Sequence, residues 1–289
     1  MADGRAGINA ELVRQLVAEQ FPQWARLPVA PVPVDGWDNR TYRLGPELTV
    51  RLPSADGYVP AVAKESRWLP VLAEGLPLPI PEIVAEGRPS RHFGRPWSVR
   101  RWIPGEVSTP TTVADHARFA DRLAEFLLAL QAIDAEAGPP AGAHSFYRGA
   151  PLSHYDDQTR RCLAAAADRI DVDRVAGLWQ EALSTGWDRP PVWFHGDIAA
   201  GNLLLRDGEL AAVIDFGTSG VGDPACDLVI SWTFLDRPGR AAYRSAMAQD
   251  EACWARARGW ALWKALLGLD GPAAAENIAV IEAVLNDAG

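Results

Sequence analysis

The sequence predicts an α+β protein with two lobes, a small β-rich N-terminal lobe over residues 1–104 and a larger, mostly helical lobe over residues 105–289. Short apolar runs separated by Gly and Pro, typical of strands, dominate the first hundred residues. Apolar residues at helical spacing dominate the rest of the chain. The 289 residues, 48% of them apolar, are enough to bury a full core, as one large domain or as two compact lobes.

The N-terminal lobe is expected to begin with a helix over residues 8–20, where apolar residues recur at helical spacing until Pro22 breaks the pattern. Residues 41–44 and 48–52 are predicted strands, and Gly45-Pro46-Glu47 between them indicates a hairpin turn. The lobe is completed by one helix and two extended segments, predicted over residues 61–73, 79–85 and 96–103 respectively.

The C-terminal lobe is predicted to start after Pro104-Gly105-Glu106, and its first long helix carries an apolar stripe from Phe119 to Ile133. Three short apolar runs between residues 192 and 214 predict a compact β unit. The last two runs are joined by Asp207-Gly208, a strong hairpin signal. Further helices are predicted over residues 156–169, 172–184 and, in several pieces, 224–286.

Composition argues against several classes of protein. No apolar leader follows Met1 and no run of 18 apolar residues occurs, so we expect a cytoplasmic protein that does not enter a membrane. The net charge of −9 argues against a nucleic-acid partner, because binding to phosphate backbones relies on clustered Lys and Arg. The same charge would suit a cationic small molecule. A monomer and a homodimer are both compatible with the sequence.

The segment that carries chemistry is His195-Gly-Asp197-Ile-Ala-Ala-Gly-Asn202, followed after a hairpin by Asp215-Phe-Gly. Phosphoryl transfer needs a carboxylate that orients the attacking hydroxyl, and oxygen ligands for the Mg²⁺ ion that neutralises phosphate charge. Since the open ends of a hairpin lie together, Asn202 and Asp215 are expected side by side. We therefore predict Asp197 as the base, His195 as the second catalytic residue, and Asn202 and Asp215 as the magnesium ligands.

Each of these residues taken singly also fits a structural role, as a turn former or a core histidine. The combination is more specific. Together with Gly222-Asp223-Pro-Ala-Cys-Asp227 it resembles the aminoglycoside phosphotransferase family, whose members have a two-lobed, protein-kinase-like fold. The resemblance implies transfer of the γ-phosphate of ATP or GTP to a hydroxyl of an aminoglycoside-type antibiotic, as in antibiotic resistance. It also implies that Asp227 supports the catalytic loop. Asp223, the second predicted structural support, also suits the N-cap of the helix that follows.

The resemblance places the nucleotide site in the N-terminal lobe. A kinase carries a lysine on its third strand, held by a Glu of the next helix. Here the strand offers Arg51 and the helix Glu65. Arginine can bind phosphate bidentately, but it differs from lysine in reach and geometry. The other predicted nucleotide-binding residues lie in the loop before the hairpin, which also fits a plain β-turn, and at the expected hinge: Asp38, Asn39, Arg101 and Trp102.

The acceptor is expected to bind in the helical lobe. A polycationic aminoglycoside needs several carboxylates facing one cleft, whereas a wall of Trp rings would suit a larger, less polar macrolide. The candidate acceptor-binding residues are Asp156, Trp232, Asp236, Asp250 and Glu251. Three alternatives stay open: a macrolide kinase, a kinase of a small metabolite hydroxyl such as that of choline or homoserine, and a non-catalytic nucleotide-binding relative. Intact Asp197, Asn202 and Asp215 argue against the last.

Overall fold

The computed structural model describes residues 7–287, which form two compact units. The first unit contains residues 7–74, 79–104 and 212–217, and the second contains residues 75–78, 105–211 and 218–287. A five-stranded sheet dominates the first unit and helices dominate the second, so the predicted α+β fold class is confirmed. Residues 212–217, which include Asp215, belong to the first unit, although they follow strands of the second along the chain.

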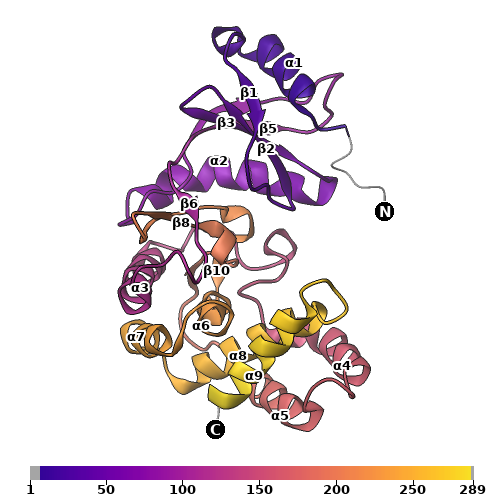
Figure 1. Cartoon of the computed structure of the whole chain (residues 1–289), viewed down its shortest axis with the longest axis vertical. Coiled ribbons are helices and arrows are strands. Elements are labelled where there is room, and N and C mark those ends of the chain that lie inside the picture. The colour runs from indigo at the N-terminus through magenta and orange to yellow at the C-terminus, as the bar shows by residue number, and fades with distance from the viewer. Residues whose placement is uncertain (1–6, 288–289) are drawn as a thin grey trace. The chain divides into compact units, whose positions relative to one another are not determined.

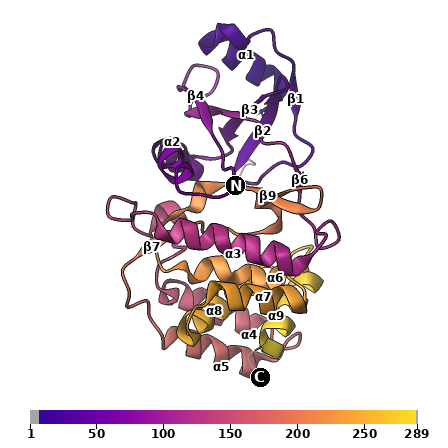
Figure 2. The same ribbon diagram turned by 90° about the vertical axis from the view of Figure 1, so that its left-hand side faces the viewer.

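The first unit is built on an antiparallel sheet with the strand order β1-β2-β3-β5-β4. Its strands lie between α1 and α2 (Figures 1 and 2). Leu16 of α1 packs with Val50 and Val99 of the sheet in one buried core. The elements are α1 (Ala10–Gln20), β1 (Val29–Pro31), β2 (Asn39–Leu44), β3 (Leu48–Pro53), α2 (Val59–Ala73), β4 (Ile83–Gly87) and β5 (Trp97–Arg101).

Most elements of this unit differ by a few residues from their predicted bounds, and for two of them the structure shows the reason. The first helix begins at Ala10 instead of residue 8, because the side chain of Asn9 caps it and accepts the N–H of Leu12 at 2.9 Å. Strand β4 begins at Ile83 instead of residue 79, because the prolines that precede it have no N–H to give to a ladder. The hairpin of β2 and β3 forms where it was predicted.

Helices make up most of the second unit, where α3 packs on α7, α5 on α8 and α8 on α9. No helix among residues 7–287 is both long and apolar enough to span a lipid bilayer. The helices are α3 (His116–Ala132), α4 (Asp156–Ala165), α5 (Val172–Leu183), α6 (Ile230–Thr233), α7 (Arg237–Met247), α8 (Glu251–Leu267) and α9 (Ala274–Asp287).

Short strands position the predicted catalytic segments. They are β6 (Glu106–Val107), β7 (Val192–Phe194), β8 (Leu203–Arg206), β9 (Glu209–Val213) and β10 (Gly220–Gly222). Strand β7 pairs with β10, and β8 lies between β6 and β9. The turn from β8 to β9 has positive φ at Asp207 and Gly208, as a tight hairpin turn requires. The His195 segment therefore leaves the end of β7, and Asp215 follows the end of β9.

Candidate active site

A buried carboxylate fixes the backbone that leads to Asp197. Asp227, in the short helix Pro224–Val229, accepts the N–H groups of His195 and Gly196, both at 2.7 Å. Burial raises the pKa of Asp227, and the two N–H donors offset part of that rise. The structure thus places Asp227 directly behind the loop that the sequence analysis assigned it to support.

Gly196 occupies a position where no side chain fits. Its φ is +85°, and a Cβ atom there would lie 2.8 Å from the carbonyl oxygen of Thr218. We expect Gly196→Ala to lower the free energy of unfolding by about 1–3 kcal/mol, from backbone strain and crowding together. Urea denaturation measures the loss. Gly201→Ala is the matched control, since Gly201 lies in the same loop with open space around it; equal stability of the two variants would contradict the expectation.

Asp197 is a partly exposed carboxylate held from both sides. Its Oδ1 accepts from Lys264 Nζ at 2.9 Å, and its Oδ2 accepts from Asn202 Nδ2 at 3.0 Å. Its own N–H donates to Nδ1 of the buried His195 at 3.2 Å. Desolvation pushes the pKa of Asp197 upward, but the charge and hydrogen bond of Lys264, together with His195 and Arg148, outweigh it and leave that pKa below its ordinary value. At neutral pH Asp197 is therefore charged and able to accept a hydrogen bond from a hydroxyl.

The amide of Asn202 has a fixed orientation. Its Nδ2 donates to both the backbone oxygen and Oδ2 of Asp197, at 2.9 and 3.0 Å. Because these two bonds use both amide hydrogens, Oδ1 of Asn202 is the atom left to bind a cation. Asn202 belongs to the second unit and Asp215 to the first, so their side-by-side placement stays a prediction.

In the first unit Asp215 pairs with the arginine that replaces the expected lysine. Arg51 Nη2 lies 2.5 Å from Asp215 Oδ1, and Arg51 Nη1 lies 3.7 Å from Glu65 Oε1. Desolvation lowers the pKa of Arg51, but the charges of Asp215 and Glu65 outweigh it, so the pKa is raised. Asp215 itself has a φ of 67°, a left-handed conformation that is uncommon outside Gly, Asn and Asp.

The buried Glu65 has a second partner that the sequence analysis missed. Arg100 on β5 donates to both carboxylate oxygens of Glu65, at 2.7 and 3.2 Å, and the two side chains are almost fully buried. Desolvation raises the pKa of Glu65, yet Arg100 and Arg51 together lower it below its ordinary value. Glu65 thus bridges two guanidinium groups instead of holding one cation.

Among the other residues predicted to bind nucleotide, Asn39 is the one whose side chain is hydrogen-bonded to Arg51 in the part of the chain that the structure describes. In the orientation that satisfies both groups, the Asn39 amide oxygen accepts from Arg51 Nε at 3.0 Å. The Asp38 carbonyl accepts the N–H of Ser54 at 2.8 Å. Arg101 and Trp102 have partners on the surface of the sheet unit: Glu82, 2.8 Å from Arg101, and the guanidinium of Arg43, 4.0 Å from the Trp102 ring centre.

The two lysines of the chain contact Asp197 and the segment that follows Asp215. Among 28 basic residues only Lys64 and Lys264 are lysines. Lys264 binds Asp197, and Lys64 donates through Nζ to the carbonyl of Gly217, two residues after Asp215, at 2.8 Å. Lysine brings a compact ammonium with adjustable reach, which the planar guanidinium lacks. The rarity of lysine was the signal in the sequence that could have identified both.

Lys64 is expected to titrate near neutrality. Desolvation lowers its pKa from 10.5 to about 8, against the attraction of Glu65 and Asp215. Because the unfolded chain then binds more protons between about pH 8 and 10.5, the contribution of Lys64 to stability should rise with pH across that window. Lysine-selective ¹³C labelling gives two Cε signals, and Lys64→Arg identifies the one to follow. A midpoint at the ordinary value would refute the expected burial of the ammonium.

The residues predicted to bind the acceptor have partners within the second unit. Asp236 and Asp250 each cap a helix, accepting N–H groups of Gly239 and Cys253, both at 2.8 Å. The remaining partners are Arg189 for Asp250, Arg244 and Arg258 for Glu251, Trp179 and Arg160 for Asp156, and the Trp254 ring for Trp232. Their predicted role in binding the acceptor stays a prediction.

A pocket borders Asp197 within the second unit, and it encloses about 20 Å³. None of the predicted acceptor-binding residues lines it. Its wall includes Arg148, Val229, Trp260, Trp263 and Lys264. Beside Asp197 the lining therefore combines two cations with aromatic and aliphatic side chains.

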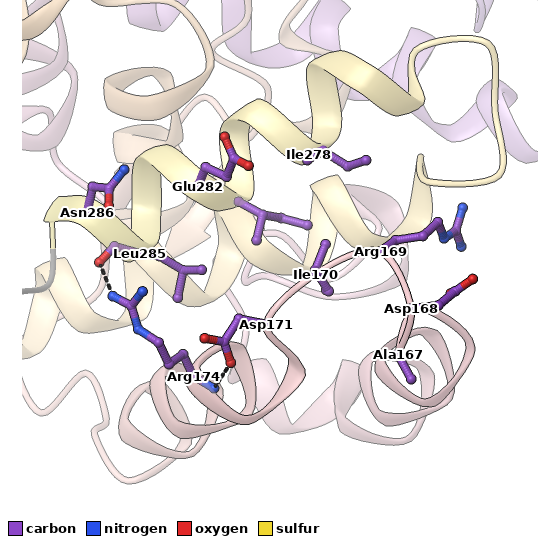
Figure 3. Close-up of a pocket in the computed structure, with 11 residues that line it drawn as sticks. Ala167, Asp168, Arg169, Ile170, Asp171, Arg174, Ile278, Glu282, Leu285 and Asn286 are labelled. Carbon is purple, nitrogen blue, oxygen red and sulfur yellow. Dashed lines mark hydrogen bonds between the residues drawn. The ribbon is translucent and has the colours of Figure 1, made fainter.

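A second pocket, of about 560 Å³, lies between the α4–α5 connection and α9 (Figure 3). Arg174 spans it, with Nη2 donating to the carbonyl of Leu285 at 3.0 Å and the backbone N–H donating to Asp171 at 3.1 Å. No residue of the predicted catalytic, metal or nucleotide sites lines this pocket. It is separate from the candidate active site.

Magnesium suits the ligand atoms that the motifs offer. The Asp215 carboxylate and Asn202 Oδ1 are hard oxygen donors, the kind that Mg²⁺ prefers. No group of three or more His, Cys, Asp or Glu side chains that could hold a metal occurs among residues 7–287. Mg²⁺ in kinases takes most of its ligands from phosphates and water, so one carboxylate and one amide fit an ion that arrives with a nucleotide.

One family model matches most of the chain, and several solved structures share its fold. The family described as "Phosphotransferase enzyme family" matches residues 29–260. The GDP complex of aminoglycoside 2′-phosphotransferase-IIIa is similar in structure, with a TM-score of 0.71, 20% identity, and coverage of 97% of this chain and 100% of that one. No curated protein sequence matches the chain.

A macrolide 2′-phosphotransferase from Brachybacterium faecium is also similar, with a TM-score of 0.61 and 21% identity, over 95% of this chain and 97% of that one. A complex of a related aminoglycoside enzyme with GDP and kanamycin gives a TM-score of 0.72 at 20% identity, over 95% and 98% of the two chains. These likenesses confirm the kinase-like fold that the sequence motifs predicted.

Proposed function

The chain belongs to the phosphotransferase enzyme family, and on this premise we propose that it transfers the γ-phosphate of ATP or GTP to a hydroxyl group of a small molecule. The observation that carries the proposal is the arrangement at Asp197. This carboxylate is charged, partly exposed and held by Lys264 and Asn202, and the buried Asp227 fixes the two backbone N–H groups that precede it, those of His195 and Gly196.

In the proposed mechanism Asp197 orients the acceptor hydroxyl for in-line attack and accepts its proton. Asn202 Oδ1 and the Asp215 carboxylate are the groups that would hold Mg²⁺, which would neutralise charge on the phosphates. Arg51, already beside Asp215, binds the phosphates through its guanidinium. Because the transition state for phosphoryl transfer is loose, most of the acceleration comes from positioning and charge neutralisation, and the base contributes the smaller part.

The acceptor predicted from the sequence is an aminoglycoside, and the similar kanamycin complex supports an aminoglycoside-type ligand for this fold. A macrolide is the second candidate, and one observation favours it. Trp260 and Trp263 line the pocket beside Asp197, and Tyr155, behind them, stacks on Trp263 with the ring centres 4.2 Å apart. Aromatic side chains at this place favour a larger, less polar ligand.

The test is magnesium-dependent nucleotide consumption by the purified protein. The acceptor panel comprises kanamycin, gentamicin, a macrolide, choline, homoserine and sugar acids, with ATP and GTP tried separately. Consumption that requires an acceptor, stops with EDTA and yields a phosphorylated acceptor by mass spectrometry supports the proposal. Nucleotide binding without consumption, across acceptors of every charge class, would favour a non-catalytic relative.

A further inference from the structure

The pocket beside Asp197 carries more positive than negative charge. Arg148 and Lys264 line it, and Asp197 is the one carboxylate among its lining residues. Lys264 already pairs with Asp197 at 2.9 Å. Arg148 forms no salt bridge within 4 Å of a carboxylate among residues 7–287; its Nη1 donates to the carbonyl of Phe146 at 3.1 Å. The charge of Arg148 contributes to the lowered pKa of Asp197. Two cations at this pocket therefore share a single carboxylate.

The aromatic surface beneath the Arg148 guanidinium is held in place. The guanidinium carbon of Arg148 lies 4.6 Å from the centre of the Trp263 ring. Nε1 of Trp263 donates to Gln158 at 2.9 Å, and the ring of Tyr155 stacks on it. Tyr155 in turn donates its hydroxyl to the Phe146 carbonyl at 2.7 Å. A cation held on a fixed ring is pre-organised, so little ordering is needed when it binds an anion.

The carboxylates that would attract a polycation are used elsewhere. Asp236 and Asp250 satisfy helix N-termini, while Glu251 and Asp156 pair with arginines. None of the four lines the pocket. An amino sugar with several ammonium groups would thus approach two like charges and a single, already paired carboxylate, which is unfavourable.

We propose that the acceptor carries a negatively charged group, such as a carboxylate, in addition to the hydroxyl that is phosphorylated, and that Arg148 and Lys264 bind this group. The inference rests on the proposed phosphotransferase function and specifies its substrate class. Arg148 supplies a planar donor fork that matches a carboxylate, and Lys264 supplies a mobile ammonium that reaches both Asp197 and the acceptor.

Three sugars of similar size but different charge test the proposal: glucuronate is an anion, glucose is neutral and glucosamine is a cation. Saturation-transfer NMR, in the presence of Mg²⁺ and a non-hydrolysable ATP analogue, gives the Kd of each. We expect glucuronate to bind at least about tenfold more tightly than glucosamine, a difference of about 1.4 kcal/mol. Arg148→Gln should abolish this preference and Arg148→Glu should invert it. Arg161→Glu, an exposed change of equal charge on α4, is the matched control and should keep it.

Equal Kd values for glucuronate and glucosamine, tighter binding of glucosamine, or no detectable binding of any sugar would overturn the proposal. So would an unchanged preference in Arg148→Glu, provided that its circular dichroism matches that of the native protein. The phosphotransferase function and the charge of the acceptor are contradicted by different results. If glucuronate is preferred but no acceptor supports nucleotide consumption, only the phosphotransferase proposal falls; if kanamycin is phosphorylated most efficiently, only the charge inference falls.

Discussion

Asp197→Asn is expected to lower kcat by about 10²- to 10⁴-fold, the usual contribution of a positioned general base. Asparagine keeps the shape of the side chain but cannot accept a proton from the hydroxyl. It also loses the ion pair with Lys264. Since the proposed nucleotide contacts belong to Arg51 and Asp215, the Kd of the magnesium nucleotide should stay nearly unchanged. Initial rates and nucleotide titrations with the same preparation measure both quantities.

Asp215→Asn provides the contrasting result. It removes a proposed magnesium ligand and the counter-charge of Arg51, so we expect weaker binding of the magnesium nucleotide together with lower turnover. Asp207→Asn is the matched control, because Asp207 lies at the tip of the same hairpin and asparagine tolerates its left-handed backbone. Native turnover in Asp197→Asn would rule out Asp197 as the base, and native nucleotide affinity in Asp215→Asn would rule out its metal role.

The catalytic loop could be predicted because its determinants are local. His195, Asp197 and Asn202 lie within eight consecutive residues, and the hairpin that follows is encoded by its Asp-Gly turn. Gly196 in place of the arginine of protein kinases was visible in the sequence, but its reason was not. Only the structure shows that a Cβ atom at this position would lie 2.8 Å from the carbonyl oxygen of Thr218.

The environment of Glu65 could not be predicted, because it depends on the register of strands that are far apart in the sequence. Arg51 on β3 lies opposite Ser98 on β5, and this register brings Arg100 to the buried carboxylate. No turn sequence between these strands fixes that register. The sequence therefore predicted the pair of Arg51 and Glu65 but missed the stronger partner.

For the acceptor site, the sequence showed how many acidic residues the helical part contains but not where they point. Asp236 and Asp250 each precede a helix, and an N-cap is the ordinary role of Asp at that position. That signal was present in the sequence and pointed away from a ligand role. The cations of the pocket, Arg148 and Lys264, come from a connection and a helix more than a hundred residues apart, so no local pattern joins them.

The largest effect on stability is expected at the ion pair of Asp223 and Arg256. Arg256 donates to both oxygens of Asp223, at 2.6 and 3.4 Å, and both side chains are more than 90% buried. Asp223→Ala leaves a buried guanidinium without a counter-charge, so we expect a loss of about 3–5 kcal/mol in the free energy of unfolding. Denaturant titration measures it. Asp270→Ala, which breaks an exposed pair with Arg169, should cost less than about 1 kcal/mol.

Two further variants separate charge from helix capping. Asp223 also accepts the N–H of Ala225 at 3.0 Å, and asparagine keeps this cap while removing the negative charge. Most of the loss should therefore persist in Asp223→Asn. The double variant Asp223→Leu with Arg256→Met removes both charges, and we expect it to recover much of the stability, because the buried guanidinium is gone. If the double variant is as unstable as Asp223→Ala, the pair stabilises through packing and capping. If it is stable but turns over slowly, the pair serves to hold Asp227, four residues further along, beneath the loop of Asp197.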